Sequence, residues 1–412
     1  MLRHGTESFT LLRASGLGLK RGGERCRLFV VLTLLLIGGL SGCRRHDFPQ
    51  YPANYREYGY VTNGGSATVT VLDLVNMRQD RVLAVGAQPS GVTANPLRNE
   101  VYVVNSGSGS ISVINAETNT VAATIPVRSK PYFIDVDAAG ERAYVANSGS
   151  NNVSIVDLNS RKEIIAVGSG EAPGMARISP DGDSLVVSNR AGNSVTVVDP
   201  HTYKVRRVFE NCPGATAISI LPDSSRAFIA CSAGHQVMSI GLARTTGNYA
   251  GKGDRLLTLL DVGRSPVDLA LKPDGGEIFA SNFDSDTISE ISTSNNEVGG
   301  AYIVGAHPAR GIVSADNSTL WISNFNADTI GVYSVDEGKL INTVHVGNNP
   351  DALAFSASGH LLYAVNAGSG DVSVVRVLSY TTKGVQVVGA LFTMLPAGKQ
   401  PNAIAVKAFK LP

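Results

Sequence analysis

The chain has 412 residues, of which 43% are hydrophobic and 17% are charged, so it is neither wholly disordered nor a coiled coil. This length exceeds what one ordinary hydrophobic core supports, and it indicates either several domains or a repeat fold. The first 42 residues hold six basic and two acidic residues, so the remainder carries a formal charge of −3 and is not expected to bind nucleic acid.

The first predicted segment is an export signal. Basic residues continue as far as Arg27, and a mostly apolar run follows at residues 28–40. As a helix this run would extend about 20 Å, which is short of a hydrocarbon core of roughly 30 Å. A basic stretch, a short apolar stretch and then small residues predict a secretory signal peptide over residues 1–42, with an uncleaved membrane anchor as the alternative.

The end of this segment, Leu40-Ser41-Gly42-Cys43, resembles the bacterial lipobox. The resemblance implies that Cys43 becomes the mature N-terminus and carries acyl chains that anchor the protein stably in a membrane. In lipoproteins of this kind an Asp after the cysteine retains the protein in the inner membrane, so Arg44 implies the outer membrane, facing the periplasm. Residues 43–56 are expected to form a short tether.

From residue 57 onwards the chain repeats one motif. In each copy an apolar strand, usually with an aromatic residue, ends in Asn or once in Cys, and consecutive copies are 42 residues apart except for one interval of 51: Asn63, Asn105, Asn147, Asn189, Cys231, Asn282, Asn324 and Asn366. Each opening strand begins with a proline, which Ala215 replaces once. Four short strands per copy, with alternating polarity and no helical period, predict a four-stranded propeller blade.

The two ends of the repeat region complement each other. Residues before Tyr58 lack an opening strand, whereas Pro401-Asn402-Ala403-Ile404-Ala405-Val406 is an opening strand with no unit after it. The C-terminal strand is therefore predicted to complete the first blade, which removes an exposed sheet edge. The predicted fold is an all-β, eight-bladed β-propeller in one domain over residues 57–412, and a seven-bladed ring with one unit displaced is the alternative.

The sequence YVTNGG at residues 60–65 and the recurring Pro-x-x-x-Ala, Pro-Asp-Gly and Tyr-Val-x-Asn elements resemble the YVTN-repeat β-propeller family. The resemblance covers essentially all of residues 54–408, and it implies the fold far more strongly than the function. Relatives include surface-layer and cell-envelope proteins, and the wider superfamily includes lactonases, cytochrome d1-type domains and members with reported DNA affinity. A shared fold does not choose among these activities.

The repeated asparagines are expected to be structural, because Asn at a strand end can bond its own local backbone and tolerates left-handed turns. The aromatic residues that precede them are expected to pack between blades. Cys212 and Cys231 are expected to form a disulfide, since the hairpin register brings them close and an exported protein occupies an oxidising compartment. Two buried thiols are the alternative.

Motifs that carry catalysis are missing from the sequence. It contains no His-x-His, Cys-x-x-Cys-His or His-Glu-x-x-His, no nucleophile elbow and no phosphate-binding loop. We therefore predict no catalytic residues, no metal and no cofactor.

Four charged residues are candidates for a binding site at the central channel. Counted from the opening proline, Asp135 and Arg177 occupy the fourth following position in neighbouring copies, and Asp268 and Arg310 occupy the second. These residues are predicted to form ion pairs between blades near the channel. The pairs either seal adjacent blades or form a polar channel mouth that binds an anion or another small solute.

Phe283 and Phe325 are candidates for a partner-binding face. They follow the repeated Asn in adjacent copies and have polar neighbours, which suits a contact surface, although packing into the turns is the alternative. The insertion Ala243–Asp254 is a second candidate contact, on the opposite face.

Together these features predict a membrane-anchored propeller of the cell envelope that binds an envelope protein, a glycan or a small ligand without catalysis. The alternative is an enzyme of the lactonase or oxidoreductase kind that acts at the channel mouth.

Overall fold

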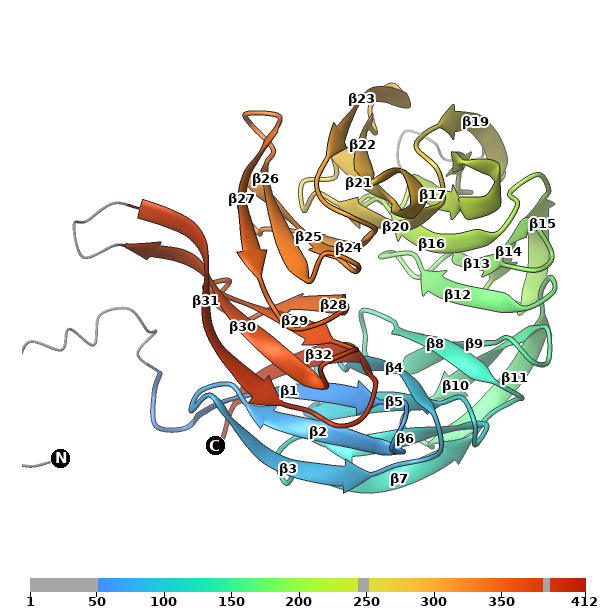
Figure 1. Ribbon diagram of the computed structural model, residues 1–412. Helices are drawn as coiled ribbons and strands as arrows, with labels where there is room; N and C mark the ends of the chain where they lie inside the picture. The colour runs from blue at the N-terminus through green and yellow to red at the C-terminus, as the bar shows by residue number, and fades with distance from the viewer. Residues whose placement is uncertain (1–50, 244–251, 381–385) are drawn as a thin grey trace, which may run out of the picture. The chain divides into compact units, whose positions relative to one another are not determined.

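The computed structural model describes residues 51–243, 252–380 and 386–412 (Figure 1). Its regular elements within these ranges are strands, apart from two short 3₁₀ turns, η2 (Ser232–Gly234) and η3 (Phe283–Ser285). None of the helices in this described part is long and apolar enough to cross a membrane. The strands form eight four-stranded antiparallel sheets, and the innermost strands of neighbouring sheets contact one another in a closed cycle. The predicted eight-bladed β-propeller is confirmed, and the seven-bladed alternative is wrong.

Every blade uses the same strand order, from the channel outwards. Blades 1 to 4 are β32 (Pro401–Lys410), β1 (Tyr55–Asn63), β2 (Thr68–Asp73), β3 (Arg78–Ala84); β4 (Pro89–Ala94), β5 (Glu100–Asn105), β6 (Ser110–Asn115), β7 (Thr120–Pro126); β8 (Pro131–Val136), β9 (Arg142–Asn147), β10 (Asn152–Asp157), β11 (Lys162–Gly168); and β12 (Pro173–Ile178), β13 (Leu185–Asn189), β14 (Ser194–Asp199), β15 (Lys204–Phe209). Blades 5 to 8 are β16 (Ala215–Ile220), β17 (Arg226–Cys231), β18 (Gln236–Gly241), β19 (Arg255–Asp261); β20 (Pro266–Leu271), β21 (Glu277–Asn282), β22 (Thr287–Ser292), β23 (Glu297–Ile303); β24 (Pro308–Val313), β25 (Thr319–Asn324), β26 (Thr329–Ser334), β27 (Lys339–His345); and β28 (Pro350–Phe355), β29 (Leu361–Asn366), β30 (Asp371–Tyr380), β31 (Gln386–Pro396).

The hydrophobic core lies between blades rather than inside one of them. In blade 2, for example, the second and third strands are buried on both faces, whereas the outermost strand is mostly exposed. One core cluster joins Tyr102 and Ile111 of blade 2 to Ile134 and Val145 of blade 3. The predicted role of the repeated aromatic residues in packing between blades is seen at Tyr102, and Trp321 of blade 7 packs in the same way against residues of blade 8. A single blade therefore cannot bury its apolar faces without its neighbours.

The repeated Asn side chains are buried, but they do not bond as the sequence suggested. Each Nδ2 donates to side-chain oxygens on the next strand; Asn189, for example, bonds Ser194 at 3.1 Å and Thr196 at 2.9 Å. Its Oδ1 accepts from the backbone N of Gly170 at 2.9 Å, in the loop that leads to the opening strand. The repeated Asn thus ties the second strand to the third strand, and in Asn189 and Asn63 its Oδ1 also bonds the loop before the opening strand. The left-handed residue lies four positions later, as at Asn193.

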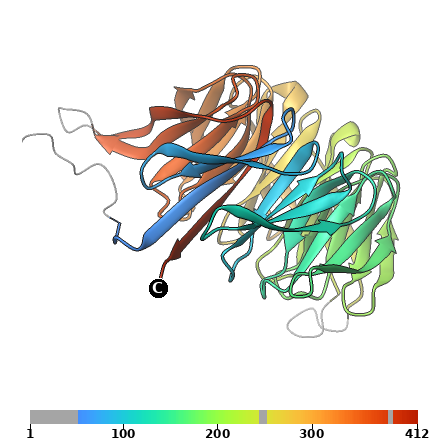
Figure 2. The same ribbon diagram turned by 90° about the horizontal axis from the view of Figure 1, so that it is seen from below.

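The ring closes where the two ends of the chain meet. β32 pairs with β1 along its length, with Tyr60 opposite Ala405, and the two strands lie side by side in both views (Figures 1 and 2). Glu57 of β1 accepts a hydrogen bond from the N of Ala357 in blade 8 at 2.8 Å. Lys407 of β32 donates to the carbonyl of Asn95 in blade 2 at 2.7 Å. The predicted closure is confirmed, and these hydrogen bonds connect blade 1, which contains both ends of the propeller, to blades 8 and 2.

Cys212 and Cys231 are joined by a disulfide in blade 5, with 19 residues of separation along the chain. Cys231 ends β17, where the other blades have the repeated Asn, and both half-cystines are fully buried in an apolar cluster. Closing a loop of this size stabilises a folded chain by about 3 kcal/mol in the chain-entropy model. In this blade the disulfide therefore links β17 to the loop that precedes the opening strand. In blade 4, a hydrogen bond from that loop to Asn189 makes the equivalent connection.

Candidate functional site

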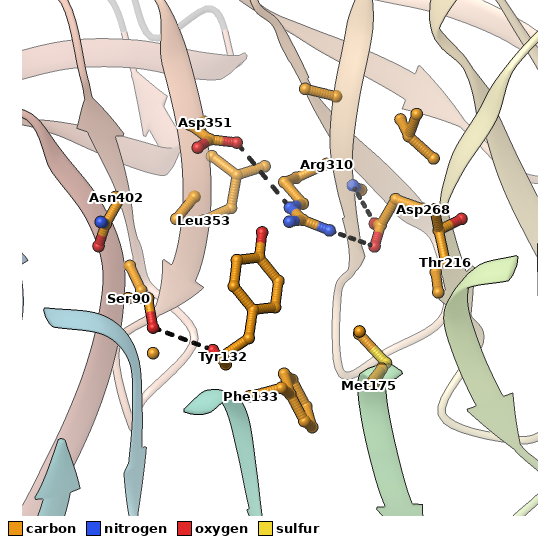
Figure 3. A pocket seen from close by; sticks show the side chains of 18 of the residues that line it. Ser90, Tyr132, Phe133, Met175, Thr216, Asp268, Arg310, Asp351, Leu353 and Asn402 are labelled. Carbon is orange, nitrogen blue, oxygen red and sulfur yellow. Dashed lines mark hydrogen bonds and ion pairs between the residues drawn. The ribbon is translucent and has the colours of Figure 1, made fainter. Parts of the chain in front are cut away.

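The central channel opens into a cavity of about 610 Å³ that residues from all eight opening strands line (Figure 3). The cavity lies at the end of the channel where the opening strands begin. Lining residues include the two that directly follow every opening proline, or its substitute Ala215: Ser90 and Gly91, Tyr132 and Phe133, Gly174 and Met175, Thr216 and Ala217, Val267 and Asp268, Ala309 and Arg310, Asp351 and Ala352, and Asn402 and Ala403.

A β-bulge explains why consecutive residues can both line the cavity. In blade 6, Pro266 pairs with Asn282 and Asp268 pairs with Ser281, so Val267 has no partner of its own on β21. A register shift occurs at the same place in the other blades. A bulge re-aims side chains locally and breaks the strict alternation of a strand. The position after each proline is therefore brought to the channel mouth.

Side chains of neighbouring blades bond the free inner edge of several opening strands. Asp268 Oδ2 accepts from the N of Gly311 at 2.9 Å, and Asp135 Oδ2 accepts from the N of Ile178 at 3.2 Å. Ser90 donates to the carbonyl of Tyr132 at 3.2 Å. These contacts satisfy backbone groups that no strand pairs with at the channel wall. The polar residues facing the channel therefore have a structural task in addition to any binding role.

The structure brings the four charged candidates together in the two predicted pairs. Arg310 Nη1 lies 3.2 Å from Asp268 Oδ1, and Arg177 Nη1 lies 4.0 Å from Asp135 Oδ1. Arg177 is also engaged elsewhere, since its Nε donates to the carbonyl of Ile218 at 3.1 Å. Its guanidinium lies 5.2 Å from the centre of the Phe133 ring. Arg177, Asp268 and Arg310 line the cavity, whereas Asp135 does not.

Sequence reasoning missed Asp351 and Tyr132. Asp351 Oδ1 lies 4.0 Å from Arg310 Nε on the side away from Asp268, so two carboxylates flank one guanidinium. Tyr132 comes from blade 3, opposite blade 7, and its phenol points towards Arg310 (Figure 3). Both residues directly follow an opening proline. The position directly after the proline could have identified both residues. Counting that assumes strict alternation of side chains between the two faces of the strand passes over it.

Burial and charge set the ionisation of this cluster. Burial raises the pKa of Asp351 above its ordinary value, although Arg310 acts to lower it, and Asp268 adds to the rise. Burial likewise raises the pKa of Asp135 against the opposing effect of Arg177. For Arg310, burial would lower the pKa, but Asp268 and Asp351 outweigh it and raise the pKa further. Arg310 therefore stays charged, and Asp351 is the member of the cluster whose charge is least stabilised.

The two aromatic candidates for a partner face line the same cavity as the charged residues. Phe283 and Phe325 lie at its rim with their ring centres 6.4 Å apart, and the ring of His307 lies 4.6 Å from that of Phe283. The structure thus merges two candidate sites into one. Both rings are half-buried. They are therefore neither fully exposed, as a partner-binding face would suggest, nor fully packed into the turns, as in the alternative.

The remaining candidates lie elsewhere. Cys43 is outside the described residues, as are residues 244–251 of the insertion. At the end of the insertion, Asp254 is buried and binds Arg206 of blade 4. Across residues 51–243, 252–380 and 386–412 there is no group of three or more His, Cys, Asp or Glu side chains suited to a metal ion.

Comparison with known proteins agrees with this architecture. Among solved structures, the protein is similar to the dihydro-heme d1 dehydrogenase NirN, with 15% identity, a TM-score of 0.67, and 87% of this chain and 76% of that chain covered. It is also similar to apo AztD from Citrobacter koseri, with 15% identity, a TM-score of 0.62, and coverage of 86% and 98%. Hydrazine synthase from Kuenenia stuttgartiensis matches with 20% identity, a TM-score of 0.53, and coverage of 67% and 92%. At these identities the likeness shows the fold alone.

A search of curated proteins found no match. A family model described as a YNCE-like beta-propeller, however, matches residues 137–406, which is more than half of the chain. That range contains blades 4 to 8 and most of blade 3, and it ends inside the closing strand β32. The protein therefore belongs to the YNCE-like β-propeller family.

Proposed function

We propose that this protein is a non-catalytic binding protein of the bacterial cell envelope, anchored through Cys43, that holds its ligand or partner at the mouth of the central channel. The observation that carries the proposal is the convergence of aromatic and charged side chains on one cavity of about 610 Å³. A cavity of this size, lined by apolar side chains and a few polar groups, suits ligand binding.

A binding role also agrees with what the cavity lacks. Within the described part of the chain, three of its charged groups, Arg177, Asp268 and Arg310, are already paired, and the lining includes no nucleophile beside a general base. The aromatic rim formed by Phe283 and Phe325 supplies apolar area next to those charges. Such a combination resembles a recognition surface more than a reaction centre.

A double substitution at the rim tests the binding role. Phe283→Ala with Phe325→Ala should reduce at least about tenfold the recovery of whatever ligand or protein co-purifies with the full-length protein from solubilised envelope, since aromatic side chains dominate such contacts. The matched control is Leu97→Ala, which removes an exposed side chain from the β4–β5 turn at the other end of the blades. Equal recovery with the rim variant and the wild type, by mass spectrometry, would contradict the proposal.

A second substitution tests the anchor. Cys43→Ala should move the protein from the membrane fraction to the soluble fraction and abolish incorporation of a labelled fatty acid, because the thiol is the predicted site of acylation. The matched control is Cys26→Ala, which removes the other cysteine of the N-terminal segment and should leave both the fractionation and the labelling unchanged. If Cys43→Ala stays in the membrane fraction after a carbonate wash, the lipid anchor is wrong and an uncleaved apolar segment holds the protein.

A further inference from the structure

Two carboxylates surround one guanidinium on one wall of the channel mouth. Asp268 and Asp351 flank Arg310 at 3.2 Å and 4.0 Å, on adjacent opening strands β20, β24 and β28. Asp268 is doubly engaged, since it also accepts from the backbone N of Gly311. The cluster therefore holds one carboxylate more than it holds guanidinium groups, and Asp351 is the carboxylate with fewer contacts.

Asp351 is available to a ligand. Among the described residues no donor forms a hydrogen bond to its carboxylate, and the 4.0 Å separation from Arg310 is too long for one. Its side chain is 32% exposed, towards the cavity that it helps to line. An incompletely solvated carboxylate with no hydrogen-bond donor is unfavourable, and a cationic donor would relieve that cost.

The surroundings of Asp351 suit an ammonium group with an apolar body. The Tyr132 hydroxyl extends into the cavity and, within the described part of the chain, also lacks a hydrogen-bond partner (Figure 3). Its oxygen is a second acceptor. Leu353 and Phe325 provide apolar surface on the same wall and at the rim. Aromatic rings also attract cations through their faces.

An anion fits this wall poorly. To reach Arg310 it would approach two carboxylates for each guanidinium, and like charges at close range are strongly unfavourable in a partly buried site. On the other side of the mouth, Arg177 is already occupied by the Ile218 carbonyl and by the Phe133 ring. Arg190 also lines the cavity and forms no ion pair within the described part of the chain, so an anion is disfavoured at the wall around Arg310 alone. At this wall the charge distribution thus favours a cationic ligand over an anionic one.

We propose that the channel mouth binds a small organic ammonium ion, with Asp351 as the charged partner, Tyr132 as a second acceptor and the ligand body against Leu353 and Phe325. This inference rests on the proposed binding function and specifies the class of ligand for the same cavity.

Three probes of similar size but different charge test the inference: phenethylammonium, 2-phenylethanol and 3-phenylpropionate. Titration calorimetry with the purified full-length protein should show that phenethylammonium binds at least about tenfold more tightly than the other two, since a charge-assisted hydrogen bond contributes more than the 1.4 kcal/mol that corresponds to tenfold. Asp351→Asn keeps the shape of the side chain and removes its charge, and it should weaken phenethylammonium binding by a similar factor.

Asp336→Asn is the matched control, because it removes the same charge from an exposed turn between β26 and β27. It should leave the affinity for phenethylammonium unchanged. Tighter binding of 3-phenylpropionate, equal binding of all three probes, no binding of any probe, or full retention of affinity in Asp351→Asn would each overturn the ammonium inference. None of these results would by itself overturn the binding function, which depends on the separate recovery experiment with the Phe283 and Phe325 variant.

Discussion

A chain that ends at Gln400 is expected to lose the folded propeller altogether. The deletion removes β32, so β1 loses its partner and blade 1 is left with three strands. It also removes Lys407, which ties blade 1 to the Asn95 carbonyl of blade 2, and exposes the apolar surface against which Phe409 packs.

The reason is that the free energy contributed by the β1–β32 pairing is comparable with the total free energy of unfolding of a domain. Each ladder hydrogen bond contributes about 1 kcal/mol net, and the apolar surface that β32 covers contributes about 25 cal/mol per Å². Over the length of the β1–β32 pairing these contributions approach the roughly 5–15 kcal/mol by which a typical domain is stable. An open ring would also present two unpaired strand edges, which favour aggregation.

Circular dichroism melting and gel filtration of the truncated chain check this expectation. The control ends at Lys410, where β32 ends, and lacks only Leu411 and Pro412. It should melt cooperatively close to the full-length protein. If the chain that ends at Gln400 also melts cooperatively within a few degrees of the full-length protein, closure by β32 is not what holds the ring together.

Replacing Asp254 is expected to have the second largest effect on stability. Asp254 binds Arg206 through two contacts, Oδ2 to Nε at 2.9 Å and Oδ1 to Nη2 at 3.0 Å, and only 4% of its side chain is exposed. Oδ1 also accepts from the N of Ala243 at 2.8 Å, and the Asp254 carbonyl accepts from Arg207 at 2.9 Å. One residue thus joins the two ends of the insertion in blade 5 and links them to the outermost strand of blade 4.

Asp254→Ala should lower the free energy of unfolding by about 3–5 kcal/mol, because it leaves the Arg206 guanidinium largely buried without its carboxylate. Chemical denaturation monitored by fluorescence or circular dichroism measures the change. Asp261→Ala is the control, since Asp261 is an exposed carboxylate at the end of the same strand, β19, and should cost less than about 1 kcal/mol. Similar losses for the two variants would show that the bridge to blade 4 contributes no more than a surface contact.

The sequence predicted the fold in detail because each repeat carries its own local signals. The opening proline, the buried middle strand that ends in Asn and the polar turn recur at a fixed spacing. A strand that is hard to assign in one repeat can therefore be assigned from the same position in the other repeats. Closure could be predicted as well, because Pro401–Val406 is an opening strand that no blade follows. The structure extends that strand to Lys410 and begins β1 at Tyr55, inside the segment expected to be a tether.

The site was predicted only in part. Counting by alternation found Asp268 and Arg310, which lie two residues after a proline, but it passed over Asp351 and Tyr132, which lie one residue after. A bulge at each opening strand breaks the alternation, and no single residue type marks it. The repeated Asn was correctly expected to be structural, yet its hydrogen bonds reach neighbouring segments rather than its own backbone.

The sequence alone determined the number of blades, their strands and the strand that closes the ring, because all of these depend on local pattern and chain order. The export signal at the N-terminus stays a prediction. Only the tertiary structure decided which side chains share the cavity. Phe325, Arg310 and Asp351 come from separate segments of the chain, and neither their meeting nor the second carboxylate beside Arg310 follows from spacing along it. The eight blades bring residues that are distant in the sequence to the central channel. The charges and apolar surfaces of the cavity therefore come from several repeats, and no single repeat contains them all.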